Sequence, residues 1–179
     1  MLYSELQCSE AIRKAVERMG FAEMTEIQEK TIPVMLAGHD VIAKAPTGTG
    51  KTCAFGIPVA EHIQPENKYP QAVIMAPTRE LAQQIAEELS NLTYFMPEVQ
   101  VACVYGGANM EKQAKRLAEG CQVVVATPGR LMDHYKHHSI DISHVTQIVL
   151  DEADEMLNMG FYKDVRHIIE MMKARKALS

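Results

Sequence analysis

The chain has 179 residues, of which 47% are hydrophobic and 23% charged, and its net charge is −5. This length predicts one globular domain, and the balance of apolar and charged residues excludes a disordered chain. No apolar run reaches the roughly 18 residues that a membrane-spanning helix needs, so no membrane partner is expected. The acidic charge excludes a protein that holds nucleic acid through a broad basic face, and leaves contacts from a few local cations.

The four cysteines are spaced too far apart to form a Cys-x-x-Cys pair. This spacing favours reduced, mostly buried thiols over a disulfide or zinc framework. Residues 1–5 have neither the basic region nor the apolar run of a secretory signal. These features predict a cytoplasmic protein. The cysteines are Cys8, Cys53, Cys103 and Cys121.

In chain order, two helices are predicted first, over residues 9–19 and 25–36, with Gly20 as the C-terminal cap of the first. Strands are predicted where runs rich in Val and Ile carry almost no charge, as strands buried on both faces do. Helical spacing of apolar residues separates these runs, for example over 79–95, and predicts a last helix over 161–173. The alternation predicts an α/β fold with a mostly parallel central sheet and helices on both faces. The predicted strands are 41–45, 72–76, 99–105, 122–126 and 145–150.

A candidate phosphate-binding loop follows the first predicted strand. Strand, glycine-containing turn and helix start are the context that such a loop requires. Two glycines let the backbone fold closely around phosphate oxygens, and successive N–H groups with the helix dipole attract the anion. The loop residues are Pro46, Thr47, Gly48, Thr49, Gly50, Lys51 and Thr52.

Within this loop, Lys51 is predicted to reach the β- and γ-phosphates and Thr52 to offer its hydroxyl to Mg²⁺. The strict pattern has glycine at the position of Ala45. The alternative interpretation is a glycine-rich turn with a chance lysine.

A second candidate group of residues follows the strand predicted at 145–150. Carboxylates at the carboxyl end of a buried strand lie where α/β proteins bind ligands. Asp151 is therefore the predicted Mg²⁺ partner, through water, and Glu152 the residue that orients and deprotonates the attacking water. The alternative is an acidic helix N-terminus that complements the helix dipole.

Residues 151–154 spell Asp-Glu-Ala-Asp, and the chain resembles the DEAD-box RNA helicases, which are named for this motif. In that family the phosphate-binding loop begins with alanine, as at Ala45. The other matches occur in the family's order. They are a Q motif at 20–28, motif Ia at 77–82, a GG element at 106–107 and motif Ib at 127–130.

The resemblance implies that residues 1–179 form the N-terminal, RecA-like P-loop domain, truncated just before the family's Ser-Ala-Thr motif, without the second RecA-like domain. The chain would be the ATP-binding half of an RNA-dependent ATPase that locally unwinds or remodels RNA, with ATP and Mg²⁺ as cofactors. The implied partners are RNA, the C-terminal RecA-like domain of the same full-length chain, and accessory proteins. The fragment alone is expected to be nearly inactive.

For ATP, the resemblance assigns adenine recognition to Gln28, whose amide offers both a donor and an acceptor. Phe21 and Thr25 belong to the same motif, and Tyr3 fills the position of an upstream aromatic that stacks on the base. The alternative is a capping box in which Thr25 opens the helix that follows.

For RNA, the resemblance implies that motifs Ia, GG and Ib grip the sugar–phosphate backbone of one strand. Arg79 and Arg130 are the charged donors, and such contacts position RNA without reading its sequence. The alternatives are a helix-end charge for Arg79 and an ordinary turn at residues 106–107. The other implied contacts are Pro77, Thr78, Gly106, Gly107, Thr127, Pro128 and Gly129.

Three other functions compete with this interpretation. A small-molecule or nucleotide kinase shares the P-loop but would need an acceptor site and a lid. An RNA-clamping scaffold without activity would not need Lys51, Thr52, Asp151 and Glu152. A DNA helicase of the same superfamily is separated by comparing stimulation by RNA and by DNA.

A histidine group is interpreted as structural. His134, His137 and His138 lie near helical spacing, but no cysteine or carboxylate completes the pattern of a metal site. A solvated helix end is therefore expected here.

Overall fold

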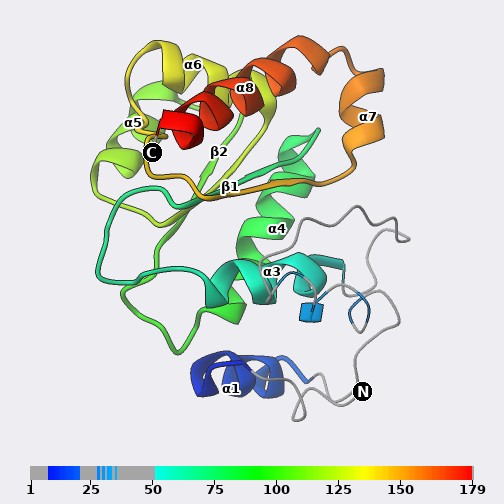
Figure 1. Ribbon diagram of the computed structural model, residues 1–179, viewed down its shortest axis with the longest axis vertical. Coiled ribbons are helices and arrows are strands. Elements are labelled where there is room, and N and C mark those ends of the chain that lie inside the picture. The colour runs from blue at the N-terminus through cyan, green and yellow to red at the C-terminus, as the bar shows by residue number, and fades with distance from the viewer. Residues whose placement is uncertain are drawn as a thin grey trace. The chain divides into compact units, whose positions relative to one another are not determined.

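The computed structural model describes residues 8–20, 28, 30, 32, 33, 35 and 51–178. The chain divides into two compact units. The first comprises residues 1–64 and 87–98, and the second comprises residues 65–86 and 99–179. Figure 1 shows α1 and α3, which belong to the first unit, and the sheet, which belongs to the second.

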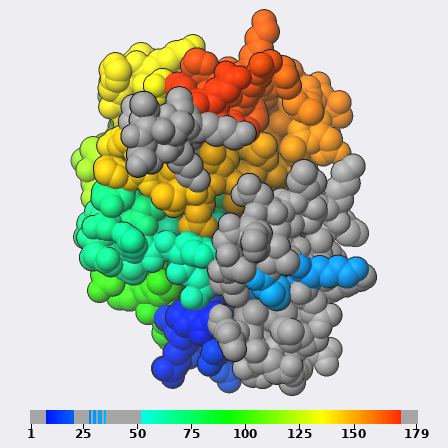
Figure 2. All heavy atoms as spheres, in the orientation of Figure 1, coloured from blue at the N-terminus to red at the C-terminus, as the bar shows by residue number. Residues whose placement is uncertain are grey.

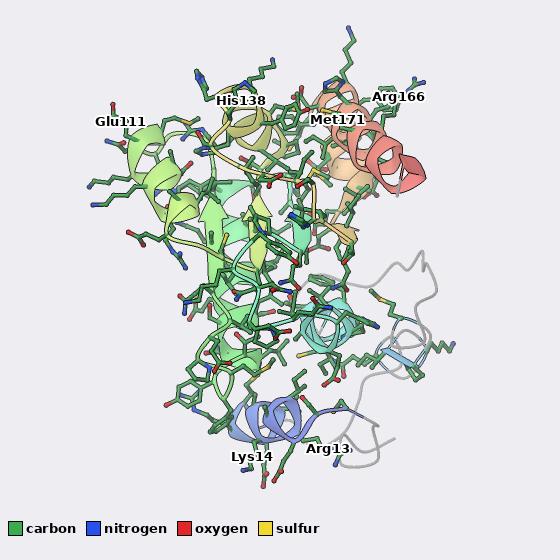
Figure 3. All side chains as sticks on the ribbon, turned by 60° about the vertical axis from the view of Figure 1, so that its left-hand side comes forward. Arg13, Lys14, Glu111, His138, Arg166 and Met171 are labelled. Atoms are coloured by element: carbon green, nitrogen blue, oxygen red, sulfur yellow. The ribbon has the colours of Figure 1, made fainter. Side chains whose placement is uncertain are left out.

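In the first unit, α1 (Glu10–Arg18) has well-formed ends. Ser9 is the N-cap, and its hydroxyl accepts a hydrogen bond from the Ile12 N–H. After the helix, Gly20 has a φ of +84°, a left-handed conformation that favours glycine, and its N–H donates to the Glu17 carbonyl. The helix predicted at 9–19 and its Gly20 cap are confirmed. Arg13 and Lys14 project from this helix in Figure 3.

Helix α3 (Lys51–Glu61) begins where the candidate phosphate-binding loop ends. Its residues from Thr52 to Ala60 are buried. It packs against the end of α4 at Gly56, where a Cβ would lie 2.7 Å from Leu92 Cδ1. An added Cβ at Gly56 would therefore require the Leu92 side chain to shift.

The predicted helix at 25–36 is confirmed at the positions that the structure describes. Gln28, Lys30, Ile32, Pro33 and Met35 are helical, and Gln28 and Ile32 are buried. The strand predicted at 41–45 lies outside the described residues.

The second unit contains a four-stranded sheet in the order β2-β3-β1-β4 with every pairing parallel. The central strands β1 and β3 are completely buried, as their uninterrupted apolar sequences predict. The outer strands are partly exposed, because each has a neighbour on one side only among the described residues. The strands are β1 (Ala72–Met75), β2 (Val101–Val104), β3 (Val123–Ala126) and β4 (Gln147–Leu150).

Helices flank this sheet, so the predicted α/β class with a parallel central sheet is confirmed. Helix α4 (Arg79–Leu92) matches the helix predicted at 79–95, and α8 (Tyr162–Leu178) extends beyond the helix predicted at 161–173. Helices α6 and α8 pack against each other, and Figures 1 and 2 show them side by side. The remaining helices are α5 (Met110–Ala118), α6 (Pro128–Lys136) and α7 (Ala153–Asn158).

Glutamines close the loops at the amino edge of the sheet. Gln122 is fully buried, and its amide accepts from the Gln100 N–H at 2.8 Å and donates to the Pro65 carbonyl at 2.9 Å. Gln71 donates in the same way to the Asn67 carbonyl at 2.8 Å. These bonds satisfy backbone groups that the short strands leave unpaired. The amino edge therefore has a structural role.

Of the four cysteines, two are buried and two are half-buried. Cys8, Cys53, Cys103 and Cys121 are free thiols. Burial raises the pKa of Cys53 to about 12, and of Cys103 and Cys121 to about 11, so these thiols stay protonated and unreactive. In the described ranges, none of the helices combines the length and the apolar character that a membrane crossing requires.

Candidate functional site

The carboxyl edge of the sheet brings together predicted site residues from separate parts of the sequence. Met75 pairs with both Ala126 and Leu150, and Val104 pairs with Ala126, so the strands end in register. Each strand then runs directly into a predicted motif. Along this edge the order is the GG element after β2, motif Ib after β3, motif Ia after β1, and Asp151 with Glu152 after β4.

Backbone hydrogen bonds extend the sheet into these motifs. The N–H of Asp151 donates to the Met75 carbonyl at 2.9 Å, and the N–H of Thr127 donates to the Val104 carbonyl at 3.1 Å. Asp151 is 4% exposed and Thr127 is 8% exposed. The first residues of motif Ib and of the Asp-Glu-Ala-Asp motif therefore continue the hydrogen-bond pattern of the sheet.

Glu152, the predicted catalytic base, has an unusual backbone conformation. Its φ of +53° and ψ of +53° are left-handed, which costs a non-glycine residue about 1–2 kcal/mol. Its side chain makes no capping hydrogen bond to α7, so helix capping does not explain why a glutamate is used here. Strained residues of this kind concentrate at functional sites.

We expect Glu152→Gly to be more stable than Glu152→Ala by about 1 kcal/mol, because both lose the carboxylate and only glycine is relaxed at positive φ. Inside an ordinary helix, the order is reversed. Urea unfolding of the two variants measures the difference. Equal stability, or a more stable alanine variant, would contradict the strain at this position.

Motif Ia places one hydroxyl in a structural role and one cation at the surface. Thr78 Oγ1 accepts the Leu81 N–H at 3.2 Å and so caps α4. Arg79 is exposed, and its guanidinium carbon lies 4.6 Å from the centroid of the Tyr105 ring, a cation–π contact. Gln83 Nε2 donates to the Tyr105 hydroxyl at 3.1 Å. The guanidinium of Arg79 is therefore at the surface and is positioned by the Tyr105 ring beneath it.

The GG element is an exposed turn between β2 and α5. Gly107 has a φ of +83°, a left-handed conformation that glycine adopts without steric cost, so the turn favours glycine at this position. At Gly106, φ is not positive and an added Cβ would meet no described atom within 4 Å. Packing within the described residues therefore does not require this second glycine.

Motif Ib opens α6. Thr127 is the N-cap residue, but its side chain makes no capping hydrogen bond, and Pro128 occupies the start of the helix, where its missing N–H is tolerated. At Gly129, an added Cβ would lie 3.9 Å from Phe161 Cε1, which is ordinary contact. The Thr127 hydroxyl is thus not committed to capping the helix, unlike that of Thr78.

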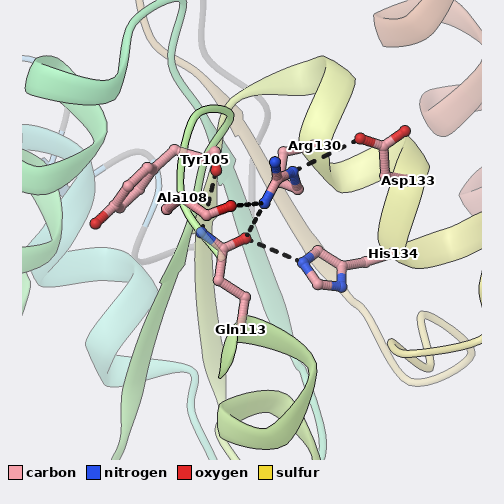
Figure 4. Close-up of polar contacts among 6 residues, drawn as sticks. All are labelled: Tyr105, Ala108, Gln113, Arg130, Asp133 and His134. Carbon is pink, nitrogen blue, oxygen red and sulfur yellow. Dashed lines mark hydrogen bonds and ion pairs between the residues drawn. The ribbon is translucent and has the colours of Figure 1, made fainter. Parts of the chain in front are cut away.

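Arg130 is more enclosed than a simple surface donor (Figure 4). Its side chain is 13% exposed, and Nη1 donates to the Ala108 carbonyl and to Gln113 Oε1, each at 3.0 Å. Its Nε lies 3.6 Å from Asp133 Oδ2, which is an ion pair too long for a hydrogen bond. Arg130 therefore links α6 to the loop that carries the GG element.

His134 corrects the expectation of a solvated helix end. It is fully buried, whereas His137 and His138 are exposed as expected. His134 Nε2 lies 3.2 Å from Gln113 Oε1. Since an amide oxygen only accepts, Nε2 carries a proton in this contact. Within the described part of the chain, no cluster of three or more metal-ligating side chains is found.

The burial of His134, with the charge of Arg130, lowers its pKa below the ordinary 6.5, while Asp133 opposes the shift. The unfolded chain therefore binds this proton more readily than the folded one. We expect the free energy of unfolding to fall as the pH drops below 6.5, because protonation of His134 is linked to unfolding. Urea unfolding between about pH 5 and 7, the range in which an ordinary histidine titrates, measures this slope.

His134→Gln keeps an amide donor but does not titrate, so this part of the pH dependence should disappear. His138→Gln, at an exposed position just after the same helix, is the matched control and should keep the wild-type slope. An unchanged slope in His134→Gln would rule out His134 as its source.

In the first unit, only part of the predicted nucleotide site lies among the described residues. The N-terminus of α3 is at Lys51, Thr52 is buried in its first turn, and Gln28 is 2% exposed. The predicted contacts Tyr3, Phe21 and Thr25 and the loop residues 45–50 lie outside the described residues.

Sequence reasoning missed Gln113 and Tyr105. The available signal was the position of Gln113 four residues before Leu117, which places a polar side chain on the buried face of α5. A buried amide on an apolar face must form hydrogen bonds, so this position could have indicated that Gln113 binds other segments.

Comparison with known proteins gives a consistent result. The profile of the DEAD/DEAH box helicases matches residues 25–179. The ATP-dependent RNA helicase CshA of Limosilactobacillus reuteri is 51% identical over 170 residues, which cover 95% of this chain and 34% of that protein. The ATP-dependent RNA helicase DeaD of Escherichia coli is 44% identical over 167 residues, covering 93% of this chain and 27% of that protein.

Solved structures agree with these relatives. A DEAD box protein from the hyperthermophile Methanococcus jannaschii superposes with a TM-score of 0.87 at 40% identity, covering 95% of this chain and 46% of that one. A hypothetical ATP-dependent RNA helicase from Sulfolobus tokodaii gives a TM-score of 0.83, also at 40% identity, covering 90% and 46%. The chain spans about a third of the length of the first curated relative, as its 34% coverage states.

Proposed function

Because the chain belongs to the DEAD/DEAH box helicase family, we propose that it is the ATP-binding part of an ATP-dependent RNA helicase. The full-length protein would be an RNA-dependent ATPase that locally unwinds or remodels RNA. The observation that carries the proposal is the in-register edge where motifs Ia, GG and Ib meet Asp151 and Glu152. The names of the relatives, both ATP-dependent RNA helicases, support the same activity.

The proposed nucleotide chemistry assigns one task to each residue. Lys51 contacts the β- and γ-phosphates, and Glu152 orients the attacking water and accepts its proton. Mg²⁺ is assigned to the Thr52 hydroxyl and, through water, to the Asp151 carboxylate, because oxygen groups are the ligands that this ion prefers. When bound, the ion would neutralise charge on the phosphate oxygens. Gln28 and the loop residues 46–50 complete the proposed ATP site, with Tyr3, Phe21 and Thr25.

The proposed RNA contacts are to phosphate and sugar, and therefore independent of sequence. Arg79 and Arg130 supply charge, and Thr78, Thr127 and the backbone N–H groups at Gly106, Gly107 and Gly129 supply neutral donors. The exposure of Arg79 and of the GG turn supports this assignment. Two cations on one edge suit a chain whose net charge is −5.

Further partners are part of the proposal. A C-terminal RecA-like domain of the same full-length protein would close over the bound ligands, which the greater length of the relatives supports. Accessory proteins and a cytoplasmic location are proposed as well. The free, protonated cysteines support a reducing compartment.

Calorimetric titration of the full-length protein with ATP, ADP and GTP in the presence of Mg²⁺ tests the nucleotide site. We expect ATP to bind more tightly than GTP, because the Gln28 amide matches the donor and acceptor of the adenine edge and guanine presents a different pattern. Gln28→Ala should lose this preference. Equal binding of ATP and GTP by the wild type would return Gln28 to a helix-capping role and reopen the kinase interpretation.

ATP hydrolysis in the presence of RNA or DNA of the same sequence tests the polymer. RNA is expected to stimulate hydrolysis more strongly, since the 2′-hydroxyl distinguishes the two. Equal stimulation would favour a general or DNA helicase.

A further inference from the structure

We infer that Gln113 is a positioning residue for RNA binding, which holds Arg130 and the loop of the GG element in their binding geometry. This inference deepens the proposed function and rests on it. Gln113 lies in α5, is 8% exposed, and belongs to none of the family motifs in the sequence.

The side-chain amide of Gln113 joins three segments of the second unit (Figure 4). Its Oε1 accepts from Arg130 Nη1 at 3.0 Å and from His134 Nε2 at 3.2 Å. Its Nε2 donates to the Tyr105 carbonyl at 3.0 Å. One buried amide therefore ties α6 to the loop between β2 and α5, and neither of its polar atoms is left without a bond.

The first consequence concerns the orientation of Arg130. Its Nη1 is held between Gln113 and the Ala108 carbonyl, and its Nε faces Asp133. Among the described residues, nothing forms a hydrogen bond with Nη2. The guanidinium is thus fixed on one side, and Nη2 is the donor through which it would meet a phosphate. Fixing a cation in advance lowers the entropy cost of binding.

The second consequence concerns Arg79. The residue whose carbonyl Gln113 holds, Tyr105, carries the ring on which the Arg79 guanidinium lies, 4.6 Å from the ring centroid. Gln83 fixes the hydroxyl of the same ring. Loss of the Gln113 amide would therefore loosen the supports of both proposed phosphate-binding cations and of the glycine turn at Gly106 and Gly107.

The test must separate positioning from a general loss of stability. Gln122 is a matched control, because it is also a buried glutamine that bonds to loop backbone, at the opposite edge of the same sheet. Met has a similar size to Gln and no amide, so Gln113→Met and Gln122→Met remove equivalent groups. Both should lower the free energy of unfolding.

The test measures ATP hydrolysis by the full-length protein as a function of the concentration of a single-stranded oligouridylate. Gln113→Met is expected to raise the RNA concentration for half-maximal stimulation about 10-fold or more, the effect of losing a well-placed charged hydrogen bond. The rate at saturating RNA and the KM for ATP should stay close to wild type. Gln122→Met should leave all three constants unchanged.

A double-mutant cycle shows whether Gln113 acts through Arg130. If it does, adding Gln113→Met to Arg130→Ala should weaken RNA binding less than the product of the two single effects. If the double variant loses RNA affinity by the full product of the two single effects, Gln113 does not act through Arg130.

If Gln113→Met does not fold, Gln113→Glu is the second variant. It keeps an acceptor for Arg130 but sets a carboxylate oxygen against the Tyr105 carbonyl, so RNA stimulation should again need more RNA. A wild-type RNA constant in the folded variant would overturn the inference, as would an equal increase in Gln122→Met. A wild-type protein that RNA does not stimulate would instead overturn the proposed function itself.

Discussion

Replacing Glu152 with glutamine should reduce RNA-stimulated ATP hydrolysis by the full-length protein about 10²- to 10⁴-fold, the usual contribution of a general base. Binding of ATP should be retained, because the variant keeps the shape of the side chain and loses only the ability to accept a proton. Hydrolysis is measured at saturating ATP and RNA, and affinity by calorimetry.

Glu155→Gln is the matched control for this experiment. Glu155 is an exposed carboxylate in the first turn of α7, close in sequence to Glu152, so the variant makes the same chemical change away from the proposed base. It should hydrolyse ATP at the wild-type rate. Unchanged turnover in Glu152→Gln would end the assignment of Glu152 as the base. A loss of ATP affinity equal to the loss of turnover would point to a role in binding.

The second large effect is expected at Lys51. Lys51→Ala should weaken ATP binding about 10- to 100-fold, since a charged hydrogen bond to phosphate is worth about 1.5–3 kcal/mol. ADP should be affected less than ATP, because the proposed contact includes the γ-phosphate. Calorimetric titration of both nucleotides with Mg²⁺ gives the two ratios.

Lys14→Ala provides the comparison for Lys51. Lys14 is an exposed lysine of α1, paired with Glu10 at 3.5 Å, and its loss should not alter nucleotide affinity. Wild-type ATP affinity in Lys51→Ala would show that the segment at residues 46–52 is not a phosphate-binding loop. An equal loss for ATP and ADP would remove the γ-phosphate contact.

Much of the fold followed from patterns that are local in the chain. Buried parallel strands are apolar on both faces, so the runs at 72–76 and 122–126 were recognisable and became β1 and β3. The same reasoning overestimated β2, which covers Val101–Val104 within the predicted 99–105. Strand length depends on pairing partners, which local composition does not reveal.

The site divides in the same way. Motifs directly after strands could be placed at one edge from the sequence, because parallel strands end at the same side of a sheet. The assignment of Arg79 and of the GG turn to the surface agrees with their exposure. The surroundings of Arg130 and the burial of His134 were not predicted, and both side chains find a hydrogen-bond partner in a glutamine of another helix.

By itself, the sequence determined the α/β class, the order of the motifs and their position at the ends of strands, because these depend on neighbouring residues. The tertiary structure alone decided how the site is held together. The partners of Gln113 lie 8, 17 and 21 positions away, and Glu152 joins β4 to α7 in a left-handed conformation. Contacts at such separations are set by how strands and helices pack, which periodicity within one element does not record.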